Sequence, residues 1–375
     1  MKISVCILLL ILPVFIGKAQ ESEPQKKPLK IGVVGMTHGH VHQILRRGKT
    51  GGDIEIVGFA EPNRDLAERL TKQYGYSSEL IYPSLEAMVQ ATNPEAVSAF
   101  NSTYEHLETV KYCAPKGIHI MVEKPLAVNW THAKEMISLA QKHQIELLTN
   151  YETSWYGSNA KAYALVHTEK KIGPIKRVVF HTGHPGPIEI GCNVEFLDWL
   201  TDPVRNGGGA LTDFGCYGAN LTTWLMKGQV PESITCITQQ LKPDKYPNVD
   251  DDATIILNYP QAEVIIQASW NWPHNVKDME VYGSTGYVFC KDGTKMNVME
   301  NEKEGPKTIE ADPLPAEAAG PFTLLKRTVH ENHTLAPFDV TTLENNRIVM
   351  QILDAARQSA EQNRTIFWNE LYPSE

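Results

Sequence analysis

The sequence predicts an α/β protein with two domains, a doubly wound parallel sheet followed by an α+β domain with an open, mostly antiparallel sheet. In the first half, short apolar runs alternate with helical patterns, and strands that are separated by helices pair in parallel. In the second half, strand-like runs follow one another with few helices between them, which favours antiparallel pairing. We place the first domain at residues 28–150 and the second at residues 151–365.

Each element is predicted from the spacing of its apolar residues, because a buried strand is a short continuous apolar run and a surface helix repeats its apolar positions every three or four residues. The expected strands of the first half are 29–35, 54–60, 96–100, 118–122 and 145–149, and the expected helices are 41–47, 63–74, 84–92, 106–116 and 133–143. The second half should contain strands 177–182, 233–240, 254–259, 264–270, 278–283 and 286–290. Residues 291–321 resemble a loop or weak hairpin, and 344–362 form a closing helix.

Residues 1–19 have the pattern of a signal peptide. Lys2 precedes the apolar run 3–16, and small residues stand at Gly17 and Ala19, where a signal peptidase would cut. We therefore expect an exported protein, periplasmic or secreted, with no membrane span once the signal is removed.

Charge and cysteine content exclude several classes of protein. Loss of the two lysines in the signal would take the net charge from -9 to -11, which argues against nucleic acid as a partner. The five cysteines after the signal are irregularly spaced and form no Cys-x-x-Cys pair, so we expect buried free thiols.

The tripeptide Glu123-Lys124-Pro125 stands directly after an apolar strand. Ligands of an open parallel sheet bind outside the carboxyl ends of its strands, so Lys124 can face a ligand there. The simpler alternative is a strand that ends in a solvated Glu/Lys pair.

The first strand is followed by a degenerate glycine turn, Gly35-Met-Thr37-His38-Gly39-His40. Such a turn can hold a dinucleotide pyrophosphate on its backbone amides, and we expect the Gly35 and Gly39 amides to do so. Glu61 ends the second strand, where a carboxylate can accept the ribose hydroxyls, which favours NAD over NADP. NADP stays possible, because Arg64 could meet a phosphate.

His38, His40 and His42 alternate, which suggests a metal site, since imidazole is a common zinc ligand. Three ligands so close along one turn cannot easily converge on one ion, so we expect no metal. Capping or cofactor contact is the preferred interpretation. Asp250, Asp251 and Asp252 lack the alternation of a calcium loop and predict a solvated turn.

A glycine loop, 206–209, opens a predicted helix that carries Asp213 and Tyr217. Residues four apart on a helix share a face, so the two side chains should lie together. The structural alternative is a capping aspartate and a packed tyrosine.

Together, Glu123-Lys124-Pro125, the glycine loop, and Asp213 with Tyr217 resemble the Gfo/Idh/MocA oxidoreductases over nearly the whole mature chain. Many members have histidine where Tyr217 stands, and the tyrosine form is similar to glucose-fructose oxidoreductase and the dimeric dihydrodiol dehydrogenases. The resemblance implies a Rossmann domain at 28–150, a substrate-binding and dimerisation domain at 151–365, and NAD(P)-dependent oxidation of CH–OH groups. Catalysis would use Lys124, Asp213 and Tyr217.

The expected cofactor site combines the turn with the ends of later strands: Gly35, Thr37, His38, Gly39, His40, Glu61, Asn101, Glu123 and Lys124. Tyr217 is the first choice of proton acceptor, because an adjacent Lys124 ammonium would favour its phenolate; Lys124 itself is the alternative. A carbohydrate or polyol substrate would meet aromatic and polar side chains, for which the candidates are Tyr151, Trp155, His184, Trp270 and Trp272.

Three functions stay open. The first is hydride transfer to or from a sugar, glycoside or polyol hydroxyl, by a homo-oligomer that associates through its C-terminal sheet. The second is redox-neutral glycoside hydrolysis with a retained NAD, which export favours because free cofactor is scarce outside the cytoplasm. The third is a non-catalytic sugar-binding module. Scarcity also predicts that the protein holds its dinucleotide tightly through purification.

Overall fold

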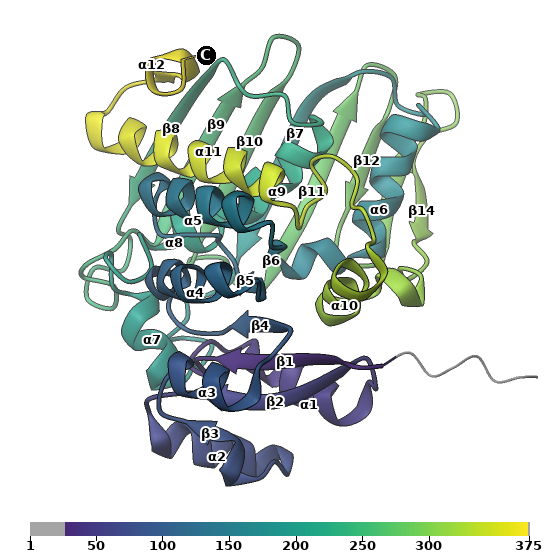
Figure 1. Ribbon diagram of the computed structural model, residues 1–375. Helices are drawn as coiled ribbons and strands as arrows, with labels where there is room; N and C mark the ends of the chain where they lie inside the picture. Colours follow the sequence, from purple (N-terminus) through teal and green to yellow (C-terminus); the bar gives the residue numbers. More distant parts are fainter. Residues whose placement is uncertain (1–26, 374–375) are drawn as a thin grey trace, which may run out of the picture.

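The structure, a computed structural model, describes residues 27–373; the expected signal peptide lies outside them. The first sheet is parallel throughout, with the order β3-β2-β1-β4-β5-β6 (Figure 1). Its strands are β1 (Leu29–Val34), β2 (Ile54–Ala60), β3 (Ile81–Tyr82), β4 (Ala96–Ala99), β5 (His119–Glu123) and β6 (Leu147–Asn150). The strand order reverses between β1 and β4, and ligands of a doubly wound sheet bind at this point.

The helices of the first domain are α1 (Val41–Thr50), α2 (Arg64–Tyr74), α3 (Leu85–Thr92), α4 (His106–Cys113) and α5 (Trp130–His143). Side chains of Asn63, Ser84 and Asn129 accept backbone N–H groups at the starts of α2, α3 and α5. The cap at Asn129 explains why α5 begins three residues before its apolar pattern does.

The second sheet has nine strands in the order β14-β13-β12-β11-β7-β10-β9-β8-β15. They are β7 (Ile175–Gly183), β8 (Ser233–Gln239), β9 (Asp252–Asn258), β10 (Glu263–Ser269), β11 (Val276–Gly283), β12 (Tyr287–Cys290), β13 (Lys295–Met299), β14 (Lys307–Glu310) and β15 (Ile366–Phe367). Only β7 and β10 pair in parallel, so the predicted fold class is confirmed. The segment expected to be a loop or weak hairpin forms β13 and β14.

Helices of the second part of the chain pack on both sheets. The second part of the chain contains α6 (Gly157–Tyr163), α7 (Val194–Leu200), α8 (Ala210–Asp213), α9 (Gly215–Leu225), α10 (Pro321–Glu331), α11 (Leu343–Gln362) and α12 (Trp368–Leu371). Helix α9 packs on β7 and β10, and α11 packs on α9 and β8 while also contacting α5 and β6, so it runs along the first domain (Figure 1). Phe322 and Leu325 of α10 enter the core of the first sheet.

The second sheet is covered on one face only. Val178 and Phe180 of β7 are buried under α9, whereas Ile237 of β8 and Ile256 of β9 lie on the other face and are exposed. The cysteines of the described chain are free thiols, and all but the half-buried Cys192 are buried, as expected. Within the described residues, no helix is both long and apolar enough to cross a membrane.

Candidate active site and cofactor groove

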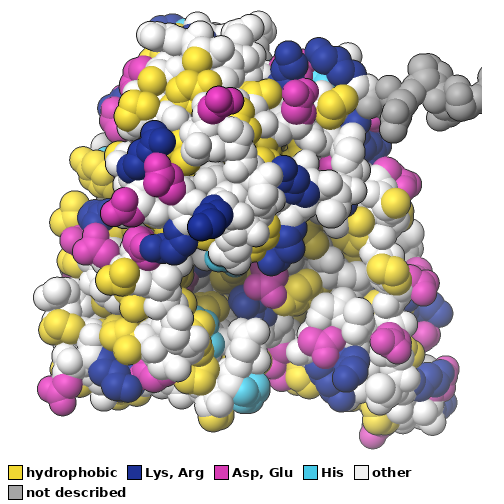
Figure 2. Space-filling view, turned by 90° about the horizontal axis from the view of Figure 1, so that it is seen from below, with side chains coloured by type: hydrophobic (Ala, Val, Ile, Leu, Met, Phe, Trp, Pro, Cys, Tyr) yellow, Lys and Arg dark blue, Asp and Glu magenta, His cyan; other side chains and the backbone are white. Residues whose placement is uncertain are grey.

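The candidate site lies where the carboxyl ends of β1, β4 and β5 meet α8 and α9 of the second domain. Figure 2 shows this side of the molecule hollowed near its middle, with lysine, acidic and histidine side chains around the hollow. The site takes its charged groups from both domains.

Lys124 and Asp213 form a buried ion pair between the two domains. The Lys124 ammonium donates to a carboxylate oxygen of Asp213 and, at 3.0 Å, to the backbone carbonyl of the same residue. Burial works to lower the pKa of Lys124 and to raise that of Asp213. The opposite charges outweigh burial, so the pKa of Lys124 lies above its usual value and that of Asp213 below. The pair stays charged at neutral pH, which rules out the solvated strand end.

Tyr217 lies beside this pair, as the resemblance implies. The Lys124 nitrogen is 5.3 Å from the centre of the Tyr217 ring, and the Lys277 nitrogen is 5.6 Å from it. The expectation of a phenolate is wrong for this structure, because burial and then the charge of Glu152 raise the pKa of Tyr217 well above its usual value. Asp213 already neutralises Lys124, so the ammonium does not offset these effects. Tyr217 is a neutral phenol.

Asp213 and Tyr217 do not share one helix, contrary to the prediction. Asp213 ends the short helix α8, and Tyr217 lies in the first turn of α9, with Phe214 between them. The glycine loop is fixed by Asp250, whose carboxylate accepts the amides of Gly209 and Leu211 at 2.9 and 2.6 Å. A Cβ on Gly209 would lie 1.7 Å from the Asp250 carbonyl oxygen, so the loop requires glycine there.

The three aspartates 250–252 are therefore not a solvated turn. Asp251 is fully buried and accepts the amides of Leu241 and Lys242. Asp252 accepts the hydroxyl of Ser269 at 2.7 Å. These partners lie on other segments of the chain, so no local pattern around the three aspartates indicates them.

Two charged residues of the site were missed. Lys277 of β11 forms an ion pair with Glu152 at 2.9 Å, and its side chain is only 9% exposed. Glu152 also accepts the hydroxyl of Tyr156 at 2.6 Å. Lys277 sits in an alternating strand pattern that does not distinguish it from a surface lysine, whereas Glu152 stands in the polar-aromatic stretch after β6.

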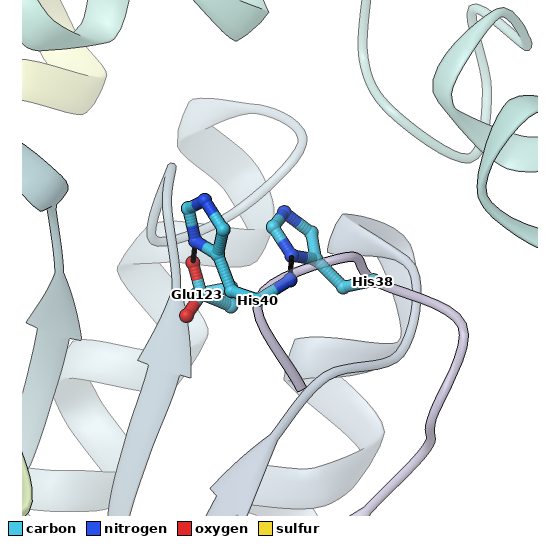
Figure 3. Close-up of side chains that lie close together, drawn as sticks. All are labelled: His38, His40 and Glu123. Carbon is cyan, nitrogen blue, oxygen red and sulfur yellow. Dashed lines mark hydrogen bonds and ion pairs between the residues drawn. The ribbon is translucent and has the colours of Figure 1, made fainter. Parts of the chain in front are cut away.

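His38, His40 and Glu123 come together at the start of α1 (Figure 3). The His40 Nδ1 lies 2.8 Å from a Glu123 oxygen, and the His38 Nδ1 accepts the backbone N–H of His40 at 3.1 Å. The other Glu123 oxygen accepts the Asn150 amide at 2.8 Å, and Asn150 in turn accepts the Trp155 indole N–H at 3.0 Å. Burial would raise the pKa of Glu123, but the two imidazoles and these hydrogen bonds bring it down to about 2.

Ligand atoms of these three residues lie within 4.8 Å of one another, a convergence that the sequence analysis did not foresee, because Glu123 comes from another strand. The donor set does not suit a metal ion. Since the His38 Nδ1 accepts a hydrogen bond, the neutral ring carries its hydrogen on Nε2 and offers no lone pair there. Burial lowers the pKa of His38 to about 3, so this ring is neutral.

A groove beside the turn runs past Glu61 and Asn101 and is lined by Gly35, Thr37 and α7. The side-chain amide oxygen of Asn101, Oδ1, is buried without a hydrogen-bond partner, so it is available to a ligand. Glu61 accepts the amides of Met36 and Asn63 at 2.7 and 2.8 Å, and each oxygen keeps a second lone pair for a ribose hydroxyl. These features fit a dinucleotide. The Arg64 side chain is exposed and forms an ion pair with Glu68, so in this structure it is not placed as a phosphate ligand.

The expected pyrophosphate contact of Gly35 is wrong for this structure, because its amide donates to the Ala60 carbonyl at 2.8 Å. Glycine is instead required at position 35 by its backbone conformation and by its close neighbours. Its φ is +72°, and a Cβ atom there would lie 2.5 Å from the Cβ of Asn101. A Cβ on Gly39 would meet nothing within 4 Å, so the turn is open toward a ligand at Gly39.

Helix α7 covers the groove, which the sequence analysis did not predict. The Trp199 indole donates to the Thr37 hydroxyl at 3.0 Å. Thr37 stands where a dinucleotide-binding turn usually has its second glycine, and here its side chain makes a contact between the two domains. Arg69 of α2 pairs with Glu195 of α7 at 2.6 Å. The cover is thus attached on both sides of the groove.

Three of the expected substrate residues, His184, Trp270 and Tyr151, lie beside the catalytic group. Only His184 among them is partly exposed, and burial lowers its pKa. Trp270 and Tyr151 are fully buried: the Trp270 indole donates to Asp213 at 2.9 Å, and the Tyr151 hydroxyl donates to Asn346 at 3.1 Å. They support the catalytic group and cannot serve as sugar platforms. Trp155 binds Asn150, as described above. Trp272 packs edge-on against His181. Because side chains alternate along β7, His181 lies on the open face of the sheet.

Two family models match the chain. Residues 29–151 match the oxidoreductase family with an NAD-binding Rossmann fold, and residues 160–289 match the GFO/IDH/MocA C-terminal domain. The chain belongs to the Gfo/Idh/MocA family of oxidoreductases. Its first domain is the NAD-binding Rossmann domain of this family, which agrees with the groove described above.

Curated relatives include trans-1,2-dihydrobenzene-1,2-diol dehydrogenases. The Xenopus laevis protein is 28% identical over 264 residues, which are 69% of this chain and 75% of the relative. The Xenopus tropicalis protein is 26% identical over 207 residues, 55% of this chain and 58% of the relative. The chain thus spans between about half and three quarters of these relatives' length.

Solved structures share the fold of this Gfo/Idh/MocA protein. An aldose-aldose oxidoreductase from Caulobacter crescentus, complexed with glycerol, has a TM-score of 0.75 and 20% identity, and the match covers 91% of this chain and 99% of that one. An inositol dehydrogenase homolog from Azotobacter vinelandii, complexed with NAD+, has a TM-score of 0.77 and 17% identity, with 91% and 98% covered.

Proposed function

We propose that the protein transfers a hydride between NAD and a hydroxyl-bearing carbon of a sugar, glycoside or polyol. The observation that carries this proposal is the buried Lys124–Asp213 pair beside Tyr217, at the carboxyl edge of an NAD-binding domain. The relatives and neighbours support the substrate class, because their names describe a dihydrodiol, aldoses and an inositol.

The chain's own residues have distinct tasks. Lys124 and Tyr217 donate hydrogen bonds to the substrate oxygen, and Asp213 keeps Lys124 charged and oriented. NAD, when bound, supplies the hydride acceptor. Asn101, Glu61 and the open turn at Gly39 hold the dinucleotide. Glu61 disfavours a 2′-phosphate, because two anionic groups would then meet in the groove.

The test is the absorbance at 340 nm of NAD-loaded protein mixed with aldoses, myo-inositol, methyl glycosides and a trans-dihydrodiol. Wild type should form NADH with at least one of them. Lys124→Ala should lower kcat/KM by about 100-fold or more, because it removes a charged donor to the reacting oxygen. Full activity in this variant would refute the assignment.

We further propose that NAD is retained between turnovers. Support comes from α7, which closes the groove through Trp199 and Arg69. Retention suits both net oxidation and a redox-neutral glycosidase, and stoichiometry separates them: release of a sugar from an aryl glycoside without net NADH would favour hydrolysis. Mass spectrometry of ligand released on denaturation tests retention itself, and an empty protein would refute it.

We infer that the protein is exported and forms a homo-oligomer. Export rests on the signal pattern of residues 1–19. Association rests on the open face of the second sheet, where Ile237 and Ile256 are exposed and suit a second copy. N-terminal sequencing after fractionation tests the first inference, and sedimentation of wild type against Ile237→Asp tests the second.

A further inference from the structure

The proposed oxidation releases a proton from the substrate hydroxyl, and the inference here rests on that proposed function. The catalytic group itself offers no ready acceptor. Lys124 is an ammonium bound to Asp213. Despite burial, this charge keeps the pKa of Asp213 below its usual value, so the Asp213 carboxylate is a weak base at neutral pH. Despite burial, the Lys277 ammonium keeps the pKa of Glu152 below its usual value, so this carboxylate is also a weak base, and Tyr217 keeps its own hydrogen. The proton therefore needs another acceptor.

Two of the three histidines around the site are hydrogen-bond donors toward it. In both His38 and His184, Nδ1 accepts a backbone N–H, from His40 and Gly186 respectively. A neutral imidazole with an accepting Nδ1 carries its hydrogen on Nε2. Neither ring can accept a proton at Nε2.

His40 has the opposite tautomer. Its Nδ1 faces the ionised carboxylate of Glu123 at 2.8 Å, so the hydrogen is on Nδ1 and the lone pair is on Nε2. Glu123 is 2% exposed and is fixed through its other oxygen by Asn150, which Trp155 holds in turn. The His40 side chain is 26% exposed, so Nε2 is accessible. In Figure 3 the distal ring edges of His40 and His38 point the same way, away from the Glu123 carboxylate.

We propose that His40 is the proton acceptor of the reaction and that Glu123 is its positioning residue. In the oxidation, the carbinol C–H bond breaks and its hydride passes to the nicotinamide; the O–H bond breaks and its proton passes to the His40 Nε2. The products are the carbonyl, NADH and a His40 imidazolium. Lys124 and Tyr217 remain hydrogen-bond donors to the oxygen throughout.

The charged surroundings of His40 suit this role. Glu123 on β5, which contacts the His40 ring, and Glu152 after β6 are the carboxylates on this side of the site. His38 on the same turn is neutral, and the two ring centres are 4.6 Å apart. Lys124 is neutralised by Asp213, and Arg46 lies further along α1. Because His40 is partly exposed, the proton can pass from it to water.

The test compares two variants, each of which retains the polar group of only one of the two imidazole nitrogens. His40→Asn retains an N–H that can reach Glu123 and lacks the distal nitrogen. His40→Gln places its amide near the position of Nε2 and loses the contact with Glu123. The measurements are kcat/KM across pH with the compound of the panel that reduces NAD fastest, the calorimetric Kd of NAD, and ¹⁵N NMR of the histidines without substrate.

If His40 accepts the proton, both variants lose about 100- to 10,000-fold in kcat/KM, as expected for loss of a general base. The NAD Kd of His40→Asn stays within about threefold of wild type, the acid limb of its pH profile disappears, and added imidazole restores part of the rate. NMR shows the His40 hydrogen on Nδ1.

An active wild type with an equally active His40→Asn overturns the assignment, as does an NMR spectrum with the hydrogen on Nε2. A His40→Asn variant whose rate loss is matched by its loss of NAD affinity also overturns it and makes His40 a cofactor contact. Failure of the proposed function looks different: wild type then forms no NADH with any compound of the panel.

Discussion

The indole of Trp270 donates to one carboxylate oxygen of Asp213 at 2.9 Å, while the other oxygen holds the Lys124 ammonium. Trp270→Phe keeps an aromatic ring but removes the donor, and the smaller phenyl ring leaves a cavity at this buried position. We expect a loss of about 1–2 kcal/mol in the free energy of unfolding, because a buried charged acceptor loses a bond. Lys124 should also be less well placed, which lowers kcat with little change in KM. A rise in KM alone would indicate a substrate platform, as the sequence first suggested.

Asp213→Asn leaves Lys124 buried without a counter-charge. We expect a loss of roughly 3–5 kcal/mol in unfolding free energy, measured by urea denaturation, because an uncompensated buried charge is strongly unfavourable. The double variant Lys124→Met with Asp213→Asn should recover part of this loss. If both single variants cost under 1 kcal/mol, the two groups do not form a buried ion pair.

Two buried histidines should make the protein less stable in mild acid. Burial lowers the pKa of His38 to about 3 and that of His106 to about 4, against 6.5 in the unfolded chain. Between these values the unfolded chain binds more protons, so stability is full above pH 6.5 and falls as the pH drops toward 4. Two such groups together lower the unfolding free energy by about 4 kcal/mol from pH 7 to pH 5.

His106→Gln separates this effect from general acid destabilisation. The variant should lose about half of the pH dependence, as measured by urea denaturation at pH 7 and pH 5. His274 is exposed, so His274→Gln is the matched control and should follow wild type. An unchanged pH dependence in His106→Gln would show that His106 is not held neutral in the folded protein.

The cover over the cofactor groove should control NAD release. Trp199→Phe removes the bond to Thr37, and Arg69→Ala removes the pair with Glu195. Each should raise the NAD dissociation rate several-fold, measured by displacement in stopped flow. Arg69→Ala should cost under about 1 kcal/mol in unfolding free energy, because the Arg69 side chain is 56% exposed. Release rates equal to wild type in both variants would show that α7 does not retain the cofactor.

Local patterns in the sequence predicted most strands of both sheets, but not the short strands β3 and β15. Continuous apolar runs predicted the buried strands, and the helices expected from Asn63 and Ser84 have side-chain caps at those residues. The cap at Asn129 was not predicted, because the helix there was expected to begin at residue 133. The short helices α6 and α7 and helix α10 were missed, because tertiary contacts decide them. Phe322 of α10 packs in the core of a sheet whose last strand ends at Asn150, 172 residues earlier in the chain.

The candidate site was predictable only in part. Lys124, Asp213 and Tyr217 were found from their motifs, and the structure brings them together. The roles of Trp270 and Tyr151 could not be read from the sequence, because an aromatic side chain looks the same whether it binds a ligand or supports a buried carboxylate. The contact between Glu123 and His40 joins residues that are 83 positions apart in the sequence, so no local spacing predicts it.

The most direct test of the central claim is hydride transfer itself. NAD-loaded wild type should be mixed with a substrate deuterated at the carbinol carbon, and the nicotinamide analysed by mass spectrometry. We predict one deuterium in the reduced cofactor from wild type. The initial rate of NADH formation by Lys124→Ala should be lower than that of wild type by about 100-fold or more. An unlabelled cofactor from substrate that has turned over, or equal rates in both proteins, would contradict an oxidoreductase centred on Lys124, Asp213 and Tyr217.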